Sequence, residues 1–324
     1  MNGPEMMYLM NPNNSPITRA QGKGARRRLV SLITSCCLAA ALLALPGIIR
    51  AQPTAHYPPG IHGINAGSLP LPGLYLRDYN LIYTSDHLNG PNGDRSGPAN
   101  FNALTYANII RPIWITDVKV LGGYLGTDIV VPLIYRSLQA GPFDHSSFGL
   151  GDVFPEVTIS WHIKQFDFCV GVGEWMPTGD SAAKPTTRAG LGFWSTMFTL
   201  GGTWFIDADR TWSLSALNRY EISNTEQPNT HTTTGNAWTI EYGLGKAFNK
   251  TISAGVVGYY QAKITDDTGA HPQPLNRVAA IGPEFDLAFP AHKLILALRY
   301  NYEFFSENRA QGHTVSLVLT KHLL

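Results

Sequence analysis

Residues 293–303 alternate in a way that constrains the fold more than any other feature of the chain. One set of alternate side chains is wholly apolar, and the other set carries the charge of Arg299 and Glu303. Successive side chains of a β-strand point to opposite faces, so a strand built from this stretch has one apolar face and one charged face. The pattern recurs about a dozen times, with almost no helical periodicity between the copies. We therefore predict an all-β fold.

Twelve segments read as strands, and many approach the roughly 9–11 residues that a tilted membrane strand needs. They are 74–84, 101–115, 118–133, 153–163, 166–176, 192–206, 211–221, 237–248, 251–264, 277–289, 293–304 and 312–322. The segment 118–133 has apolar residues on both faces, which makes its ends the hardest to place.

The connections between these segments alternate between short and long along the whole chain. The short ones fall at 116–117, 164–165, 207–210, 249–250 and 290–292. The long ones, which are rich in turn-forming residues, fall at 85–100, 134–152, 177–191, 222–236 and 265–276, with a shorter one at 305–311. Tight turns at one end and longer loops at the other are typical of outer-membrane barrels, whereas a Greek-key sandwich has no reason to keep this rhythm. We predict an up-and-down antiparallel outer-membrane β-barrel of about 12 strands over residues 74–324.

Aromatic residues gather at both ends of the predicted strands. Those near short turns are Trp114, Trp161, Phe166, Trp204, Phe205, Trp212, Phe248 and Phe289. Those at the opposite ends are Tyr259, Tyr260, Tyr300, Tyr302, Phe304 and Phe305. Two girdles at interface depth indicate lipid contact. The alternative is that these residues form the core of a large soluble sandwich, and the absence of a terminal aromatic residue at Leu324 departs from the usual barrel pattern.

The N-terminus carries the features of an export signal. Arg26, Arg27 and Arg28 precede an apolar run at 29–49, and Ala51 offers a small residue at the exit. We predict a signal peptide over residues 1–51. The run is also long enough to be weighed as a transmembrane helix, although Pro46 interrupts it near its end. Cleavage near Ala51 would leave Cys169 as the one cysteine of the exported part, which would then contain no internal disulfide.

The exported part is sparsely charged and slightly acidic. Charged residues make up 15% of the chain, against about 25% in ordinary soluble domains. Of the 24 basic and 23 acidic residues, six basic residues and one acidic residue precede position 52. The remaining excess of acid gives no indication of a nucleic-acid partner. Residues 52–73 are rich in Pro and Gly and lack periodicity, so we read them as a lead-in that could plug the barrel from the periplasmic side.

Several short motifs resemble the family named for the meta-pathway of phenol degradation. They are Tyr57-Pro-Pro-Gly60, Gly67-Ser-Leu-Pro70, Leu76-Arg-Asp-Tyr79, Gly149-Leu-Gly-Asp152, Pro177-Thr-Gly-Asp180, Thr265-Asp-Asp-Thr-Gly269, Asn276-Arg-Val278, Ile281-Gly-Pro283 and Ser306-Glu-Asn-Arg309. Their order and spacing cover the whole exported part. The resemblance implies an outer-membrane β-barrel transporter encoded beside genes for aromatic-compound degradation in Gram-negative bacteria. It supplies no catalytic residue.

Twelve polar residues face the lumen if the apolar side of each strand faces lipid. They are Asp128, Glu156, His162, Asp167, Arg219, Glu221, Glu241, Lys263, Glu284, Asp286, Arg299 and Glu303. They could line a water-filled path or cross-link the lumen as salt bridges, and these alternatives stay open. A barrel of twelve strands lies between the filled interior of eight strands and the open channel of 16 or more, which suits a narrow conduit or one small ligand.

The sequence offers little for chemistry beyond transport. It contains no Gly-x-Ser-x-Gly nucleophile elbow and no metal-ligand spacing, so we predict neither catalysis, nor a metal, nor a cofactor. Our hypothesis is passive uptake of small apolar or aromatic molecules, with outer-membrane lipid and the solute as partners. Two alternatives stay open. One is a structural barrel with a blocked lumen, and the other is a lipid-modifying enzyme that uses Ser316 with His162 or His322.

Overall fold

The computed structural model describes residues 54–181 and 187–324. The predicted signal peptide, with its cleavage point near Ala51, lies outside the described residues, as do the first two residues of the predicted lead-in. Among the described residues, no helix has the length and apolarity needed to cross a membrane.

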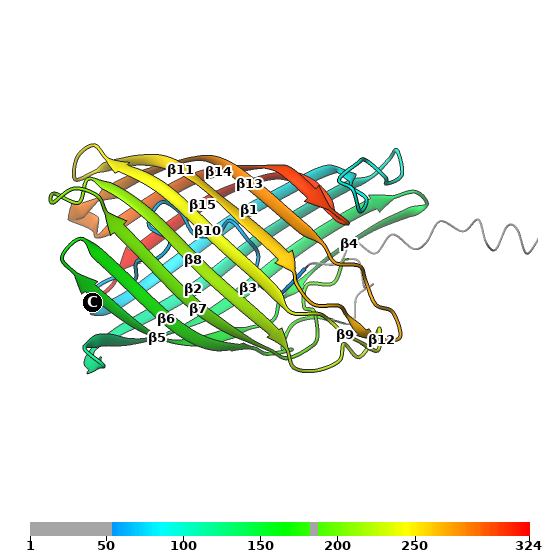
Figure 1. The fold of residues 1–324 in the computed structure, drawn as a ribbon, viewed down its shortest axis with the longest axis horizontal. Helices are drawn as coiled ribbons and strands as arrows, with labels where there is room; N and C mark the ends of the chain where they lie inside the picture. The colour runs from blue at the N-terminus through cyan, green and yellow to red at the C-terminus, as the bar shows by residue number, and fades with distance from the viewer. Residues whose placement is uncertain (1–53, 182–186) are drawn as a thin grey trace, which may run out of the picture. The chain divides into compact units, whose positions relative to one another are not determined.

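The described part is a closed antiparallel β-barrel (Figure 1). Its strands are β1 (Gly73–Leu88), β2 (Asn102–Val120), β3 (Gly123–Ala140), β4 (Phe143–Leu150), β5 (Phe154–Ile163), β6 (Phe166–Trp175), β7 (Ser195–Phe205), β8 (Trp212–Ser223), β10 (Ala237–Ala247), β11 (Ile252–Lys263), β13 (Arg277–Phe289), β14 (Leu294–Glu307) and β15 (Ala310–His322). Strands that follow one another in the wall pair with each other, except that β4 and β5 both pair with β3 and not with each other. β1 also pairs with β15, which closes the barrel. A short pair, β9 (Thr232–Thr233) and β12 (Thr268–Gly269), joins two long loops, and the one-turn helix η1 (Pro290–His292) lies in a short connection.

Two strands share one place in the wall. β4 pairs with the end of β3 from Leu133 to Ala140, and β5 pairs with its start from Tyr124 to Val130. β4 and β5 are therefore two parts of one interrupted strand, and the barrel has 12 strands as predicted. The interruption lies at residues 151–153, next to the long connection that follows β6.

The wall has its apolar face outside and its polar face inside. On β14, Leu298 is 53% exposed and Tyr302 is 44% exposed, while the intervening Arg299 and Asn301 are buried. The same alternation holds on β5, where Glu156 and Thr158 are buried and Val157 is exposed. In a soluble sandwich the apolar residues would be the buried ones. This polarity excludes the sandwich alternative.

The predicted turn at 116–117 is wrong. β2 continues to Val120, and the chain reverses at Leu121 and Gly122, which have positive φ angles of 50° and 82°. Such angles suit a two-residue hairpin turn, and Gly adopts them without steric cost. Thr116 and Asp117 instead lie in an irregularity of the β2–β3 register, between Ile115 and Lys119.

Two predicted loops are largely strand. Within 134–152, β3 runs on to Ala140 and β4 returns from Phe143, so a hairpin extends the wall on the long-loop side. Within 305–311, only residues 308–309 separate β14 from β15, because Asn308 adopts a positive φ of 53°. Turn-forming residues made both segments read as loops, although each contains a single tight reversal.

Most of the predicted girdle residues lie on the outer face, but two do not. Trp114, Trp204, Tyr302 and Phe304 are exposed on the wall, as expected for lipid contact. Phe205 and Tyr259 are buried, so their assignment to the girdles is wrong. Each is one position away from an outward-facing neighbour, and a shift of one residue moves a side chain to the opposite face of a strand.

An arginine at the middle of the outer face should destabilise the barrel. Leu200 is the central residue of β7 and is 58% exposed, so Leu200→Arg should lower the free energy of unfolding in lipid vesicles by about 2–4 kcal/mol. Leu121→Arg is the matched control, since Leu121 lies in a turn, is 87% exposed, and should cost about 0–1 kcal/mol. Urea titration of the reconstituted protein measures both. Equal effects at the two positions would contradict a lipid-facing wall.

Candidate functional site: a lead-in segment inside the barrel

Of the predicted lead-in 52–73, the structure describes residues 54–73, and Gly73 already belongs to β1. The lead-in residues 54–72 contain no strand and run inside the barrel from one end to the other. At its start, Arg309 in the β14–β15 turn donates a hydrogen bond of 2.9 Å from Nη1 to Thr54 Oγ1. Near its end, Ser68 Oγ donates to Asp167 Oδ2 over 2.8 Å, beside the short turn between β5 and β6. The lead-in therefore enters at the long-loop end and leaves at the short-turn end, where β1 begins.

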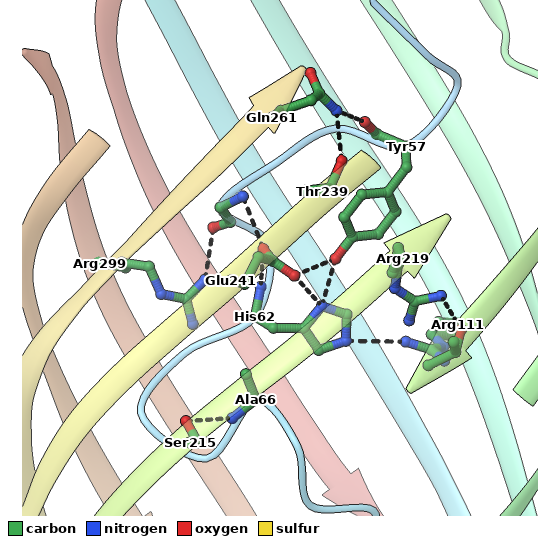
Figure 2. Close-up of polar contacts among 12 residues, drawn as sticks. Tyr57, His62, Ala66, Arg111, Ser215, Arg219, Thr239, Glu241, Gln261 and Arg299 are labelled. Atoms are coloured by element: carbon green, nitrogen blue, oxygen red, sulfur yellow. Dashed lines mark hydrogen bonds and ion pairs between the residues drawn. The ribbon is translucent and has the colours of Figure 1, made fainter. Parts of the chain in front are cut away.

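Glu241 on β10 holds the middle of the lead-in (Figure 2). Its Oε1 accepts hydrogen bonds from the backbone N–H groups of Gly60 at 2.7 Å and His62 at 3.1 Å. Its Oε2 accepts from the Tyr57 hydroxyl and lies 3.1 Å from His62 Nδ1. A buried carboxylate is stable only when such donors replace water, so Glu241 and the lead-in satisfy each other.

His56 is held between two carboxylates at the start of the lead-in. Its Nδ1 lies 2.7 Å from Glu221 Oε1, and its Nε2 lies 3.2 Å from Asp152 Oδ2. Ser195 Oγ donates to the same Glu221 oxygen over 2.8 Å. His56 therefore links the lead-in to carboxylates on two sides, Glu221 on β8 and Asp152 beside β5.

Residues 60–66 of the lead-in, toward the short-turn end, are held mainly through their backbone. Arg299 Nη1 donates to the carbonyl oxygen of Gly60 at 2.9 Å, and Glu284 Oε1 accepts from Ile64 N–H at 3.1 Å. Arg299 and Glu284 also form an ion pair with each other. Ser215 donates to the Ile64 carbonyl at 2.9 Å and accepts from Ala66 N–H at 3.3 Å. Wall side chains thus replace the strand partners that this irregular segment lacks.

A network of charged side chains connects several strands on the inner face of the wall, beside the lead-in. Arg111 makes a bidentate pair with Asp128, with both N–O distances 2.8 Å, and a second contact of 3.2 Å with Glu156. Arg219 reaches the other Glu156 oxygen at 3.3 Å. Arg111 Nη1 lies 3.3 Å from His62 Nε2. Because guanidinium can only donate, that nitrogen is an acceptor and His62 is neutral.

The other predicted lumen residues are placed as follows. Asp167 pairs with His162 at 3.1 Å and with Arg210 at 2.7 Å. Lys263 pairs with Asp267 at 2.7 Å near the long loops. Glu303 accepts hydrogen bonds from the hydroxyls of Tyr259 at 2.8 Å and Tyr83 at 3.0 Å, and from Gly312 N–H at 2.6 Å. Asp286 lies half-buried beside Glu284, and its Oδ1 has no hydrogen-bond partner.

Sequence reasoning missed four residues that hold the lead-in or its network, namely Tyr57, His56, His62 and Arg111. Arg111 is the one charged residue in the apolar run 109–115, and that isolation was a usable signal. The two histidines gave none, because their partners lie on β8 and β10, more than 150 positions away in the chain. Among the described residues, no group of three or more His, Cys, Asp and Glu side chains is arranged to hold a metal ion.

Two adjoining cavities lie on the long-loop side of the lead-in. The first, of about 100 Å³, has mainly apolar walls that include Ile109, Val130, Phe154 and Met197. The second, of about 230 Å³, is bounded by Tyr83, Tyr259 and Glu303 among others. Both are lined by residues 55–58 of the lead-in and by Thr105, Ala107 and Arg136. On the short-turn side, a cavity of about 10 Å³ lies beside Ser68 and Cys169.

Comparison with known proteins supports the fold. A family model described as "Putative MetA-pathway of phenol degradation" matches residues 85–319. An outer membrane channel from Pseudomonas putida F1 has a similar structure, with a TM-score of 0.70 and 12% identity over 82% of this chain and 100% of that chain. The β domain of the Bordetella autotransporter BrkA is more distant, with a TM-score of 0.46 and 11% identity over 78% of this chain and 99% of that chain. No curated protein matches the sequence.

A closed barrel with an apolar outer face satisfies every wall hydrogen bond internally, which is what a strand structure needs in order to span a lipid bilayer. Such barrels are found in the outer membranes of Gram-negative bacteria. This chain is an outer-membrane β-barrel.

Removing the Glu241 carboxylate should loosen the lead-in. Glu241→Ala leaves two backbone N–H groups and the Tyr57 hydroxyl without their acceptor, and each buried unpaired donor costs about 1–3 kcal/mol. Cys169 is buried in a cluster with Ala66 of the lead-in, so its alkylation by a polar maleimide reports lead-in displacement. We expect alkylation to be roughly tenfold faster in Glu241→Ala.

Glu307→Ala is the matched control, because Glu307 pairs with Arg277 away from the lead-in. The heat-dependent shift in gel mobility verifies that each barrel is folded. An unchanged alkylation rate in folded Glu241→Ala would show that Glu241 does not hold the lead-in.

Proposed function

The chain belongs to the family described as "Putative MetA-pathway of phenol degradation", and on that premise we propose that it lets small apolar or aromatic molecules cross the outer membrane passively. The observation that carries the proposal is the pair of adjoining cavities inside a closed barrel, on the side of the long loops. Long loops face the exterior in barrels of this kind, so a solute from outside would meet these cavities first. The similar structure from Pseudomonas putida F1 is itself called an outer membrane channel.

In this proposal the lead-in closes the route of the solute through the barrel lumen. It separates the two larger cavities from the small cavity on the short-turn side, and its bonds to the wall come from side chains of several strands. Those bonds are individually modest and can exchange with water. A path to the periplasm therefore requires displacement of the lead-in and leaves the strand pairing of the barrel intact.

A structural barrel with a permanently blocked lumen is the competing proposal. The contacts of Arg299 and Glu303 fit it equally well, since both residues link elements across the interior. The two proposals differ in what Arg299→Ala and Glu303→Ala should do. In a structural barrel both variants lose stability with unchanged permeability, whereas in a channel a loosened lead-in raises permeability.

The arrangement gives little support to a lipid-modifying enzyme. Ser316 lies opposite Arg299 and Leu81 on neighbouring strands. The His162 ring belongs to β5 and contacts Asp167. His322 stacks on Tyr75, six positions along β15 from Ser316, a separation of about 20 Å in a strand. We therefore propose transport without catalysis.

Flux of phenol into proteoliposomes tests the function. Phenol entry should be faster with the protein than without it, faster again with Glu241→Ala, and should exceed entry of a sugar of similar size. Protein that is folded but conducts neither solute, even with Glu241 replaced, would contradict a transport role.

Filling the border between the two cavities should block the path. Ala107 lines both cavities, and Ala107→Trp would occupy much of that space. We expect phenol flux to fall about tenfold or more, with little change in barrel stability. The adjacent Tyr106 is exposed on the outer face, so Tyr106→Trp is the control and should leave flux unchanged. Equal flux in the two variants would place the path elsewhere.

A further inference from the structure

Arg136 stands at the border of the two outer cavities, and no ion pair among the described residues balances its charge. Arg111, Arg219 and Arg299 each pair with a carboxylate at 3.3 Å or less. No ion pair among the described residues includes Arg136. Its guanidinium makes one hydrogen bond to a described residue, from Nη1 to the carbonyl oxygen of Arg188 at 3.0 Å. A guanidinium has five N–H donors, so most of those on Arg136 remain available to a ligand.

A second guanidinium beside it adds to the excess of positive charge. Arg188 is buried and donates to Gln227 Oε1 at 2.8 Å, but its Nη1 has no hydrogen-bond partner. Burial lowers the pKa of Arg188, and the charge of Asp152 only partly offsets that effect.

The carboxylate nearest to this pair is already occupied. Asp152 accepts hydrogen bonds from the backbone N–H groups of Gly179, Leu191 and Gly192, at 3.0, 2.5 and 3.2 Å, and it contacts His56. Burial would raise its pKa, but the His56 contact and these N–H groups lower it, so Asp152 is ionised and committed to other partners. The excess positive charge at Arg136 and Arg188 therefore remains.

An unpartnered neutral donor is buried beside the first cavity. Trp175 lines it and is buried, and its indole N–H has no acceptor. Indole nitrogen can only donate. Two independent groups of this region, a guanidinium and an indole, thus lack acceptor oxygens, while Phe154, Met197 and Ile109 supply apolar surface between them.

We propose, building on the transport function above, that the two cavities form a binding site for a small aromatic monocarboxylate, with Arg136 as the residue that selects the carboxylate. A planar carboxylate matches the fork of a guanidinium in a bidentate pair. A benzene ring fits an apolar cavity of about 150 Å³, and the larger cavity here has about 230 Å³. The ring lies against the apolar wall and the carboxylate faces Arg136.

Titration of the folded protein in detergent with benzoate, benzamide and toluene tests this proposal. Benzoate should bind at least tenfold more tightly than benzamide, which has the same shape and no charge. Arg136→Met should lose that preference while toluene affinity changes less than threefold, and Arg136→Lys should retain an intermediate preference. Arg277→Met, which removes an arginine on the outside of the barrel, is the control and should change nothing.

Equal affinity of the wild-type protein for benzoate and benzamide would overturn the inference, and so would unchanged benzoate binding in Arg136→Met. The comparison of the two ligands on the wild-type protein decides the matter even where Arg136→Met does not fold. Phenol flux without a benzoate preference would remove the carboxylate site and leave the channel. Absence of flux for both phenol and benzoate would remove the transport function itself.

Discussion

The interior of this barrel depends on finding a partner for each buried charge. A carboxylate or guanidinium withdrawn from water costs several kcal/mol unless other groups replace its hydration. The wall meets part of this demand itself, since Arg111 on β2 and Arg219 on β8 both reach Glu156 on β5, although neither strand pairs with β5. Glu241 and Glu221 form no such ion pair with a wall arginine among the described residues, although Ser195 of β7 donates to Glu221. Their partners are backbone N–H groups and histidines of the lead-in.

The lead-in and the lumen therefore stabilise each other in a reciprocal way. An irregular backbone buried in a protein needs hydrogen bonds that a regular strand would supply. Here Glu241, Glu284, Ser215 and Arg299 supply them. A barrel of twelve strands has room for such a segment, whereas one of eight is filled by its own side chains. The lead-in makes a dense set of bonds across the middle of the lumen, and the space left over lies on the long-loop side.

Much of the wall could be predicted because its rules are local. Alternation with a period of two fixes which residues face lipid, and it predicted β5 and β14. The rhythm of short and long connections predicted the twelve-strand barrel. Turn placement was harder to predict. Thr116 and Asp117 resemble a turn in composition, but the chain reverses at Leu121 and Gly122, where the φ angles are positive. The contacts of His56 and His62 could not be predicted, since they require the position of a non-periodic segment relative to strands far along the chain.

The distribution of paired charge also separates structural residues from those open to a solute. Where each carboxylate has its partners, as for Glu156 and Asp128, the ion pairs hold the strands of the wall together. Where pairing is incomplete, the cost of burial persists in the empty state and falls when a ligand supplies the missing group. At Arg136 incomplete pairing coincides with the two outer cavities. In the site that we propose, the carboxylate of the solute supplies the group that Arg136 lacks.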